Sequence, residues 1–287
     1  MGMLRDKMEG DLRLKGFSEH TQDCYLRYAR FFAEHYRRSP AEMGEQEIKD
    51  FLLCLINEKG VSPGVHRMYV ASLKFLYRVT LKRPECVAEI PYPKVPRRLP
   101  EILTGHEVLR LINCITSISS RTIAMVLYGA GLRVSEATVL MPDDIDSKRG
   151  VIHVREGKGR KDREVMLGVE VLNALRKCWR IVDPQPPWLF PSKVNPARPV
   201  SVSSIQHAVS QAAKAARLKK RVTPHVLRHC FATHLVEAGY HIGVIQVLLG
   251  HSSIDTTQRY ARLQADALRQ IKSPLDLVGT PGGEVLR

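Results

Sequence analysis

Residues 223–262 constrain the fold more than any other stretch, because they carry several helix-boundary signals in close succession. Thr223 followed by Pro224 is typical of a helix N-cap with proline at the first helical position. The apolar run 242–249 predicts a second helix, which Gly250 ends by supplying the left-handed backbone common at helix C-termini. The sequence therefore predicts short helices separated by turns over this stretch.

Ionisable residues occupy the first turns and the ends of these helices. His225 and Arg228 lie three residues apart, so one helical face presents both. His251 directly follows the glycine stop, and Tyr260 falls in a third helix that capping-box spacing predicts to begin at Asp255. Side chains at such positions can converge on one anion.

Three motifs follow one another along the chain. The first is GLRVSE at 131–136, and the second is GKGRKD at 157–162. The third consists of His-x-x-Arg at 225–228, Leu-Gly-His at 249–251 and the tyrosine at 260. In this order the motifs resemble the catalytic boxes of the tyrosine recombinases, the phage-integrase superfamily. The resemblance covers residues 100–275 well and the N-terminal part more loosely.

The resemblance implies a site-specific DNA recombinase that integrates or exchanges mobile DNA. Its tyrosine attacks a DNA phosphate and forms a 3′-phosphotyrosyl link, which keeps the bond energy, so religation needs neither ATP nor another cofactor. No G-x-x-x-x-G-K-[ST] phosphate loop occurs in the sequence. The implied catalytic residues are Arg133, Lys158, His225, Arg228, His251 and the nucleophile Tyr260.

These residue types fit the chemistry of phosphodiester cleavage. A phenol is a weak nucleophile at its ordinary pKa of about 10, and nearby cations favour the phenolate. Two planar guanidinium groups match the nonbridging phosphate oxygens, and the two histidines can hydrogen-bond the same phosphate. Lys158 can protonate the departing 5′ oxygen, with Arg160 and Lys161 as alternatives in the same turn.

The net charge of +15 favours a polyanionic partner. Lys and Arg exceed Asp and Glu by five in residues 1–100 and by ten in 101–287, so both halves are basic. Such a chain suits a clamp around a polyanion, which the family resemblance implies is double-stranded DNA. Membrane binding is not expected, because no run reaches roughly 18 apolar residues and no signal peptide opens the chain.

The six cysteines are widely separated and form no C-x-x-C pair, which indicates reduced thiols in the cytoplasm. A metal site is the rival interpretation of one segment, since His225 and His229 are four apart on a helix, near Cys230 and His234. Arg228 would repel a cation there, so we predict no metal and structural roles for His229 and His234.

The N-terminal residues 1–89 predict a four-helix bundle in the place of the family's core-binding domain. An aromatic stripe at residues 25–36 is expected to be core, and Ser18 and Ser62 are expected to cap helices. Residues 90–100, with four prolines, predict an extended basic linker. Candidate DNA-phosphate contacts are Arg27, Arg30, Arg67, Lys74, Arg78, Lys94, Arg97, Arg98, Arg160 and Lys161.

Residues 101–287 predict an α+β catalytic domain, so the whole chain is mainly helical with a small β-hairpin. The strands are expected at 151–155 and 163–167, around the basic turn. Glu136 is expected to orient the local backbone or an arginine, and the acidic group at 143–146 to form a helix-ending turn. The C-terminal end, 273–287, is expected to be loosely held.

The resemblance also implies a homotetramer on two duplexes, in which protomers exchange a C-terminal segment at about Ala265 to Leu277. Two other functions stay open at this point. A type IB topoisomerase-like enzyme would use the same residues to relax supercoils, and a DNA-binding regulator would bind without cleavage. Xer-like, phage and integron branches also stay open, although 183–222 is too short to hold the usual integron insertion.

Overall fold

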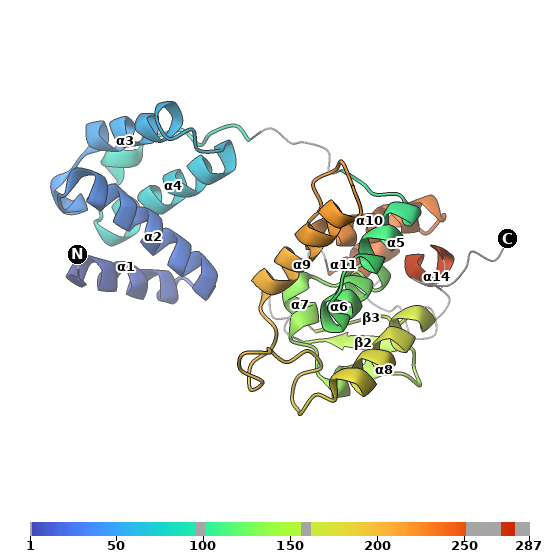
Figure 1. Ribbon diagram of the computed structural model, residues 1–287. Coiled ribbons are helices and arrows are strands. Elements are labelled where there is room, and N and C mark those ends of the chain that lie inside the picture. The colour runs from blue at the N-terminus through green and yellow to red at the C-terminus, as the bar shows by residue number, and fades with distance from the viewer. Residues whose placement is uncertain (1, 96–100, 156–161, 251–270, 279–287) are drawn as a thin grey trace. The chain divides into compact units, whose positions relative to one another are not determined.

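The computed structural model describes residues 2–95, 101–155, 162–250 and 271–278 (Figure 1). The chain divides into two compact units, Met1–Arg98 and Leu99–Arg287. Both are mainly helical, and a small antiparallel sheet lies in the second. Within the described ranges, no helix is long and apolar enough to cross a membrane.

The N-terminal unit is built from four α-helices, which confirms the predicted bundle. Ser18 and Ser62 cap the second and fourth helices, because their hydroxyls accept hydrogen bonds from the backbone N–H of Thr21 and Val65. A π-helical turn, η2, continues the fourth helix. The elements are α1 (Gly2–Leu14), α2 (Glu19–Tyr36), η1 (Pro40–Glu42), α3 (Glu45–Asn57), α4 (Pro63–Phe75), η2 (Leu76–Thr80) and η3 (Pro84–Val87).

The aromatic stripe of α2 belongs to the core of this unit, as predicted. Phe32 is fully buried, with its ring centroid 5.2 Å from that of Phe51 on α3. Tyr28 packs its ring 4.3 Å from that of Tyr69 on α4. The stripe therefore joins α2 to both following helices by ring contacts.

The C-terminal unit is organised around α6, whose residues 122–129 are all buried. Helices α8, α10 and α14 pack against it. Thr104 and Glu107 form a capping box at the start of α5. The elements are α5 (Gly105–Asn113), α6 (Ile118–Gly129), α7 (Val134–Thr138), η4 (Pro142–Asp144), β1 (Ile145–Asp146), β2 (Val151–Val154), β3 (Arg163–Met166), α8 (Val169–Val182), α9 (Val202–Ala215), α10 (Pro224–Glu237), α11 (Ile242–Leu249) and α14 (Pro274–Val278).

The sheet has the order β1-β2-β3, with both pairs antiparallel. The predicted strands β2 and β3 are confirmed, and Val151 pairs with Met166. The interpretation of the acidic group as a helix-ending turn was wrong for Asp146 but not for Asp144. Asp146 lies in β1, and Asp144 ends a 3-10 turn, where its carboxylate contacts the Arg155 guanidinium at 2.6 Å.

The expectation of a loose C-terminal end was wrong for residues 273–278. The Ser273 hydroxyl donates a hydrogen bond of 2.7 Å to the carbonyl oxygen of Gly129, and Leu275 is fully buried. Asp276 accepts hydrogen bonds from the backbone N–H groups of Val169 and Glu170, which caps α8. Helix α14 is thus held by the rest of the C-terminal unit, and Figure 1 shows it beside α5 and α8.

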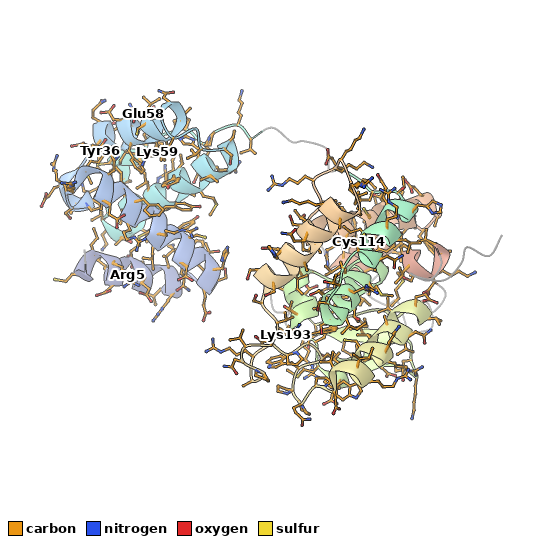
Figure 2. The ribbon with its side chains drawn as sticks, viewed as in Figure 1. Arg5, Tyr36, Glu58, Lys59, Cys114 and Lys193 are labelled. Carbon is orange, nitrogen blue, oxygen red and sulfur yellow. The ribbon has the colours of Figure 1, made fainter. Side chains whose placement is uncertain are left out.

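All six cysteines lie within the described ranges and are free thiols. Cys114, labelled in Figure 2, ends α5, whereas Cys178 and Cys230 are buried in the core of the C-terminal unit. Burial raises the pKa of the Cys230 thiol, whose sulfur accepts a hydrogen bond from the backbone N–H of Leu103. Cys230 therefore acts as a core residue.

Candidate active site

Arg133 stands at the N-terminus of α7, immediately after the break that ends α6. Gly131 makes this break with a φ of +68°, and a Cβ there would lie 2.5 Å from the ring of Phe231 on α10. Glycine is thus required both by the backbone conformation and by the close approach of α10. The break projects Arg133 while leaving 23% of its side chain exposed.

Arg228 projects from the second turn of α10 and is 4% exposed. Its guanidinium donates to the carbonyl oxygen of Gly131, in the first motif, and to that of Leu249, at the end of α11. Burial lowers the pKa of Arg228, and the nearby charge of Arg133 lowers it further, to about 10. Arg228 therefore stays charged at neutral pH and connects segments from two motifs.

Glu136 brings the two motif arginines together. Its carboxylate accepts hydrogen bonds from the backbone N–H of Arg133 at 2.8 Å and from the Arg133 guanidinium at 2.7 Å. Arg228 lies 3.7 Å from the same carboxylate. Burial by itself raises the pKa of Glu136, but hydrogen bonds from Arg163 and Arg133 outweigh it and bring the pKa to about 2. The prediction that Glu136 orients backbone and arginine is confirmed.

Arg163 is a third arginine at this carboxylate, and the sequence analysis did not select it. Its two terminal nitrogens donate to the two oxygens of Glu136 at 3.0 and 2.7 Å. Its Nε donates to the carbonyl oxygen of Leu248 at 3.2 Å. In the sequence it is one of several cations around a basic turn, and only its place on β3, facing α7 and α11, sets it apart.

Of the predicted histidines, His225 lies exposed in the first turn of α10. Its ring packs against His229, with centroids 4.6 Å apart. His234 has the expected structural role, because its two ring nitrogens contact the Tyr128 hydroxyl at 2.8 Å and the Leu103 carbonyl oxygen at 2.9 Å. Among the described residues, no group of three metal-ligating side chains occurs.

Several predicted site residues lie outside the described ranges. Of the catalytic set these are Lys158, His251 and Tyr260. The structure describes the chain on either side of them: β2 ends at Val154, β3 begins at Arg163, and α11 ends at Gly250. The DNA-contact candidates in the same position are Arg97, Arg98, Arg160 and Lys161.

The remaining DNA-contact candidates belong to the N-terminal unit, where most are exposed. Arg27, Arg30, Arg67, Arg78 and Lys94 all face solvent. Lys74 differs, because it is 8% exposed. Its ammonium lies over the ring of Tyr92 at 4.9 Å from the centroid, and the Arg67 guanidinium lies 5.5 Å from the same centroid. Burial lowers the pKa of Lys74, with the Arg78 charge adding to the effect.

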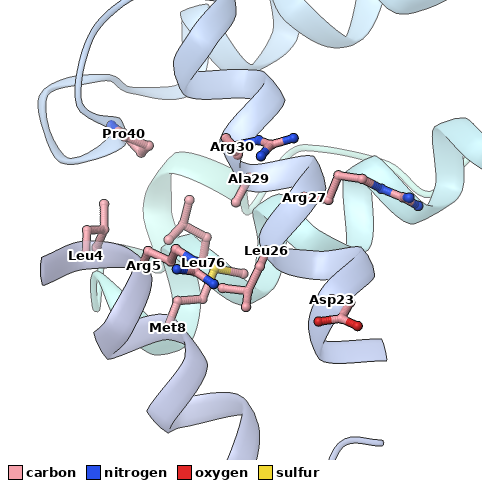
Figure 3. A pocket seen from close by; sticks show the side chains of 10 residues that line it. All are labelled: Leu4, Arg5, Met8, Asp23, Leu26, Arg27, Ala29, Arg30, Pro40 and Leu76. Carbon is pink, nitrogen blue, oxygen red and sulfur yellow. The ribbon is translucent and has the colours of Figure 1, made fainter. Parts of the chain in front are cut away.

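The N-terminal unit also holds a cavity of about 510 Å³ between α1 and α2. Figure 3 shows Met8, Leu26 and Leu76 close together in this region, with arginines from α1 and α2 among the lining residues. None of the motif residues lines it. The lining residues are Leu4, Arg5, Met8, Asp23, Leu26, Arg27, Ala29, Arg30, Pro40 and Leu76.

Two family models match the chain. The phage integrase family model matches residues 101–266, and the phage integrase N-terminal SAM-like domain model matches residues 4–85. The chain belongs to the phage integrase family. It is therefore an enzyme, a tyrosine-type site-specific DNA recombinase, and the mainly helical fold with a small sheet is that of its relatives.

Similar proteins cover nearly the whole chain. A Sinorhizobium fredii protein with the provisional name integrase/recombinase y4qK is 41% identical over 282 residues, covering 98% of this chain and 91% of its own length. The tyrosine recombinase XerA of Thermococcus kodakarensis is 35% identical over 282 residues, covering 97% of both chains. These identities extend through both units.

Two solved structures share the fold. The XerA recombinase crystal structure is 30% identical, with a TM-score of 0.51, and covers 93% of this chain and 96% of its own. A lambda integrase dimer bound to a COC′ core site is 21% identical, with a TM-score of 0.72, and covers 91% of this chain and 94% of its own. The second likeness is one of fold.

Proposed function

We propose that this recombinase cleaves and rejoins double-stranded DNA sites through a 3′-phosphotyrosyl intermediate on Tyr260. The phenolic oxygen attacks the phosphorus, the bond to the 5′ oxygen breaks, and the departing oxygen takes a proton from Lys158. The reverse step, with a new 5′-hydroxyl as nucleophile, releases the tyrosine. Bond number is conserved in each step, so no ATP or other cofactor enters.

The observation that carries this proposal is the meeting of Arg133 and Arg228 at Glu136. The two arginines come from distant parts of the chain, yet one carboxylate lies 2.7 Å from the first and 3.7 Å from the second. With Arg163, three positive charges surround one negative charge, which leaves a net positive site. Such a site stabilises the additional negative charge of a phosphoryl transition state.

Glu136 has a defined part in this site. Without a carboxylate between them, three guanidinium groups would repel one another. Glu136 holds them close together, and its negative charge lowers the net charge of the site from +3 to +2. His225 lies exposed on the first turn of α10, the helix that also carries Arg228, so its ring can contact a ligand that approaches from solvent. We assign hydrogen bonding of the phosphate to His225 and His251.

We further propose that four protomers act on two duplexes and exchange the segment at about Ala265 to Leu277. Support comes from the docking of Ser273–Val278, which rests on close approach to glycines. A Cβ at Gly129 or Gly168 would lie within 3.2 Å or 2.6 Å of a Ser273 side-chain atom. In the proposed tetramer, the same surface would receive the segment of a neighbouring copy. Because the substrate is DNA, we place the enzyme in the cytoplasm with it.

The proposal is tested with a suicide substrate, a duplex nicked close to the cleavage position so that the cut strand is lost. We expect the wild-type enzyme to form a covalent protein–DNA adduct resistant to denaturant and removed by protease. Tyr260→Phe should form none while binding the same duplex. Adduct formation by Tyr260→Phe would contradict the assigned nucleophile.

The assembly is tested in the same reactions. Synaptic complexes of Tyr260→Phe with two duplexes should contain four protomers by mass, and a paired-site substrate should give recombinant products with the wild-type enzyme. Relaxation of supercoiled DNA without recombinants would favour the topoisomerase-like activity instead.

A further inference from the structure

Arg163 makes contacts that join three motif-bearing segments. It begins β3, the strand that follows the segment with Lys158. Its two terminal nitrogens donate to both oxygens of Glu136 on α7, and its Nε donates to the Leu248 carbonyl oxygen on α11. Only 12% of the side chain is exposed, which is unusual for an arginine serving as a plain surface charge.

The hydrogen bonds at Glu136 fill the acceptor capacity of its carboxylate. Oε1 accepts from the guanidiniums of Arg133 and Arg163, and Oε2 accepts from the Arg133 backbone N–H and from Arg163. A carboxylate has about four lone-pair sites, and these bonds occupy all of them. The other guanidinium donors of Arg133 are thereby left to a different acceptor, such as a phosphate, as are those donors of Arg228 that the carbonyl oxygens of Gly131 and Leu249 do not take.

The end of α11 depends on the same side chain. The last carbonyl groups of a helix have no partner within it. Arg163 satisfies Leu248 and Arg228 satisfies Leu249, so two cations cap the negative end of the helix dipole. At Gly250 the backbone turns with a φ of +62°, and a Cβ there would lie 3.0 Å from Cδ of Arg163. The chain then continues directly to His251.

We propose that Arg163 is a positioning residue for the phosphoryl-transfer site: it fills the acceptor sites of Glu136 and holds the end of α11, and so fixes Arg133 relative to the start of β3 and the end of α11. It acts through these groups and does not touch the scissile phosphate. The proposal rests on the proposed function of the site and adds to it a residue that ties the basic turn to both arginine motifs.

The test compares Arg163→Gln with Arg163→Lys in single-turnover adduct formation at saturating enzyme. Glutamine lacks both the positive charge and the two-pronged geometry of the guanidinium group. We expect the rate of adduct formation to fall roughly 10²-fold, the size typical of a catalytic group displaced by about 1 Å. Lysine keeps the charge without the two-pronged geometry, and we expect a loss of about 10-fold. DNA affinity should stay within a few-fold of wild type in both variants.

A pH profile separates positioning from mere stabilisation of the fold. Arg133 from the start of α7, Arg163 from β3 and Arg228 from α10 face Glu136. Removing Arg163 takes away a hydrogen bond and a charge that lower the pKa of Glu136, while burial still raises this pKa and Arg133 still lowers it. The pKa of Glu136 should therefore rise, and the acid side of the rate profile should move to higher pH in Arg163→Gln. In Arg163→Lys the retained charge should keep that limb close to wild type. If Arg163 served only to stabilise the fold, Arg163→Gln should form less adduct in total, while the pH dependence of the rate should stay unchanged.

Arg149→Gln is the matched control. Arg149 makes a two-pronged contact with Glu164 in the same sheet, at 2.8 and 3.1 Å, without reaching Glu136. Its loss should leave both rate and profile unchanged. A folded Arg163→Gln with the rate and pH profile of the wild type would overturn the proposal.

Hydrogen exchange of the DNA-free protein distinguishes failure of this proposal from failure of the proposed function. Arg163→Gln should speed exchange of the peptide that spans the end of α11, while α6 and the N-terminal unit keep wild-type rates. This outcome needs no activity, so it stands even if Tyr260 is not the nucleophile. Unchanged exchange at the end of α11 would count against the proposal in the same way as an unchanged rate.

Discussion

Two arginine–glutamate contacts, one in each unit, hold their positive charges in opposite surroundings. In the N-terminal unit Arg30 is 56% exposed and pairs along its helix with Glu34, which is 58% exposed. In the catalytic unit Arg228 is 5% exposed at its side chain and lies beside a carboxylate that is 8% exposed. Exposed pairs are screened and contribute little to stability, whereas buried charges interact strongly and hold a fixed geometry.

The comparison separates two tasks of positive charge on a DNA enzyme. Solvated arginines attract a polyanion whatever its exact position, and they can adapt to it. Chemistry on one phosphate needs guanidinium groups whose places are set before the substrate arrives. The buried Glu136 provides that preorganisation, and no described carboxylate in the N-terminal unit gathers arginines in this way.

The largest expected effect comes from a change in the buried cluster around Glu136. Arg228→Lys keeps the charge but cannot reach both the Gly131 and Leu249 carbonyl oxygens, so we expect the rate of adduct formation to fall about 10³-fold. Single-turnover cleavage of the suicide substrate measures it. Arg155→Lys is the control and should cleave normally, because Arg155 pairs with Asp144 outside the cluster and its side chain is 55% exposed. A loss smaller than tenfold in Arg228→Lys would refute the assigned role.

A second prediction concerns the charge of Glu136 and the stability of the fold. Its folded-state pKa of about 2 lies below the ordinary 4.5, so its ionised form stabilises the fold above pH 4.5. This contribution, about 3 kcal/mol, is lost as the pH falls toward 2. Glu136→Gln should therefore flatten the pH dependence of the unfolding free energy over that window. Denaturant titrations at several pH values measure the slope.

The control for this prediction is Glu34→Gln, because Glu34 belongs to an exposed pair. Its unfolding free energy should follow the wild-type pH dependence. If the unfolding free energies of Glu136→Gln and Glu34→Gln show the same pH dependence, the buried ion cluster contributes no more to stability than the exposed pair does.

The smallest expected effect concerns the exposed arginines of α2 in the N-terminal unit. Arg27→Gln and Arg30→Gln should each weaken DNA binding a few-fold and lower the slope of log K against log salt by about 1. Their adduct rates at saturating enzyme should equal that of the wild type. Arg13→Gln, at an exposed pair with Glu9 on α1, serves as the matched charge control. An unchanged salt slope in both α2 variants would remove these residues from the DNA interface.

Local chemistry determined much of the fold and part of the site. The serine caps at Ser18 and Ser62 and the glycine stop at 250 act within a few residues, so the sequence predicted the helices that they begin or end. The motifs placed Arg133 and Arg228 in the site, and the spacing of Glu136 from Arg133 indicated its orienting role. The two-residue strand β1 was missed because it is too short to show a periodic pattern.

Tertiary structure alone decided which other residues join the site and which segments are held. Arg163 reaches Glu136 and Leu248 across long intervals of sequence, and no local pattern distinguishes it from its basic neighbours. Residues 273–278 precede a glycine- and proline-rich end, yet α14 docks because glycines at 129 and 168 leave room for it. Helix boundaries follow from short-range hydrogen bonds, which the sequence encodes locally. The burial of an ion cluster depends on how distant segments pack together, so it cannot be predicted from local sequence and is seen only in the folded chain.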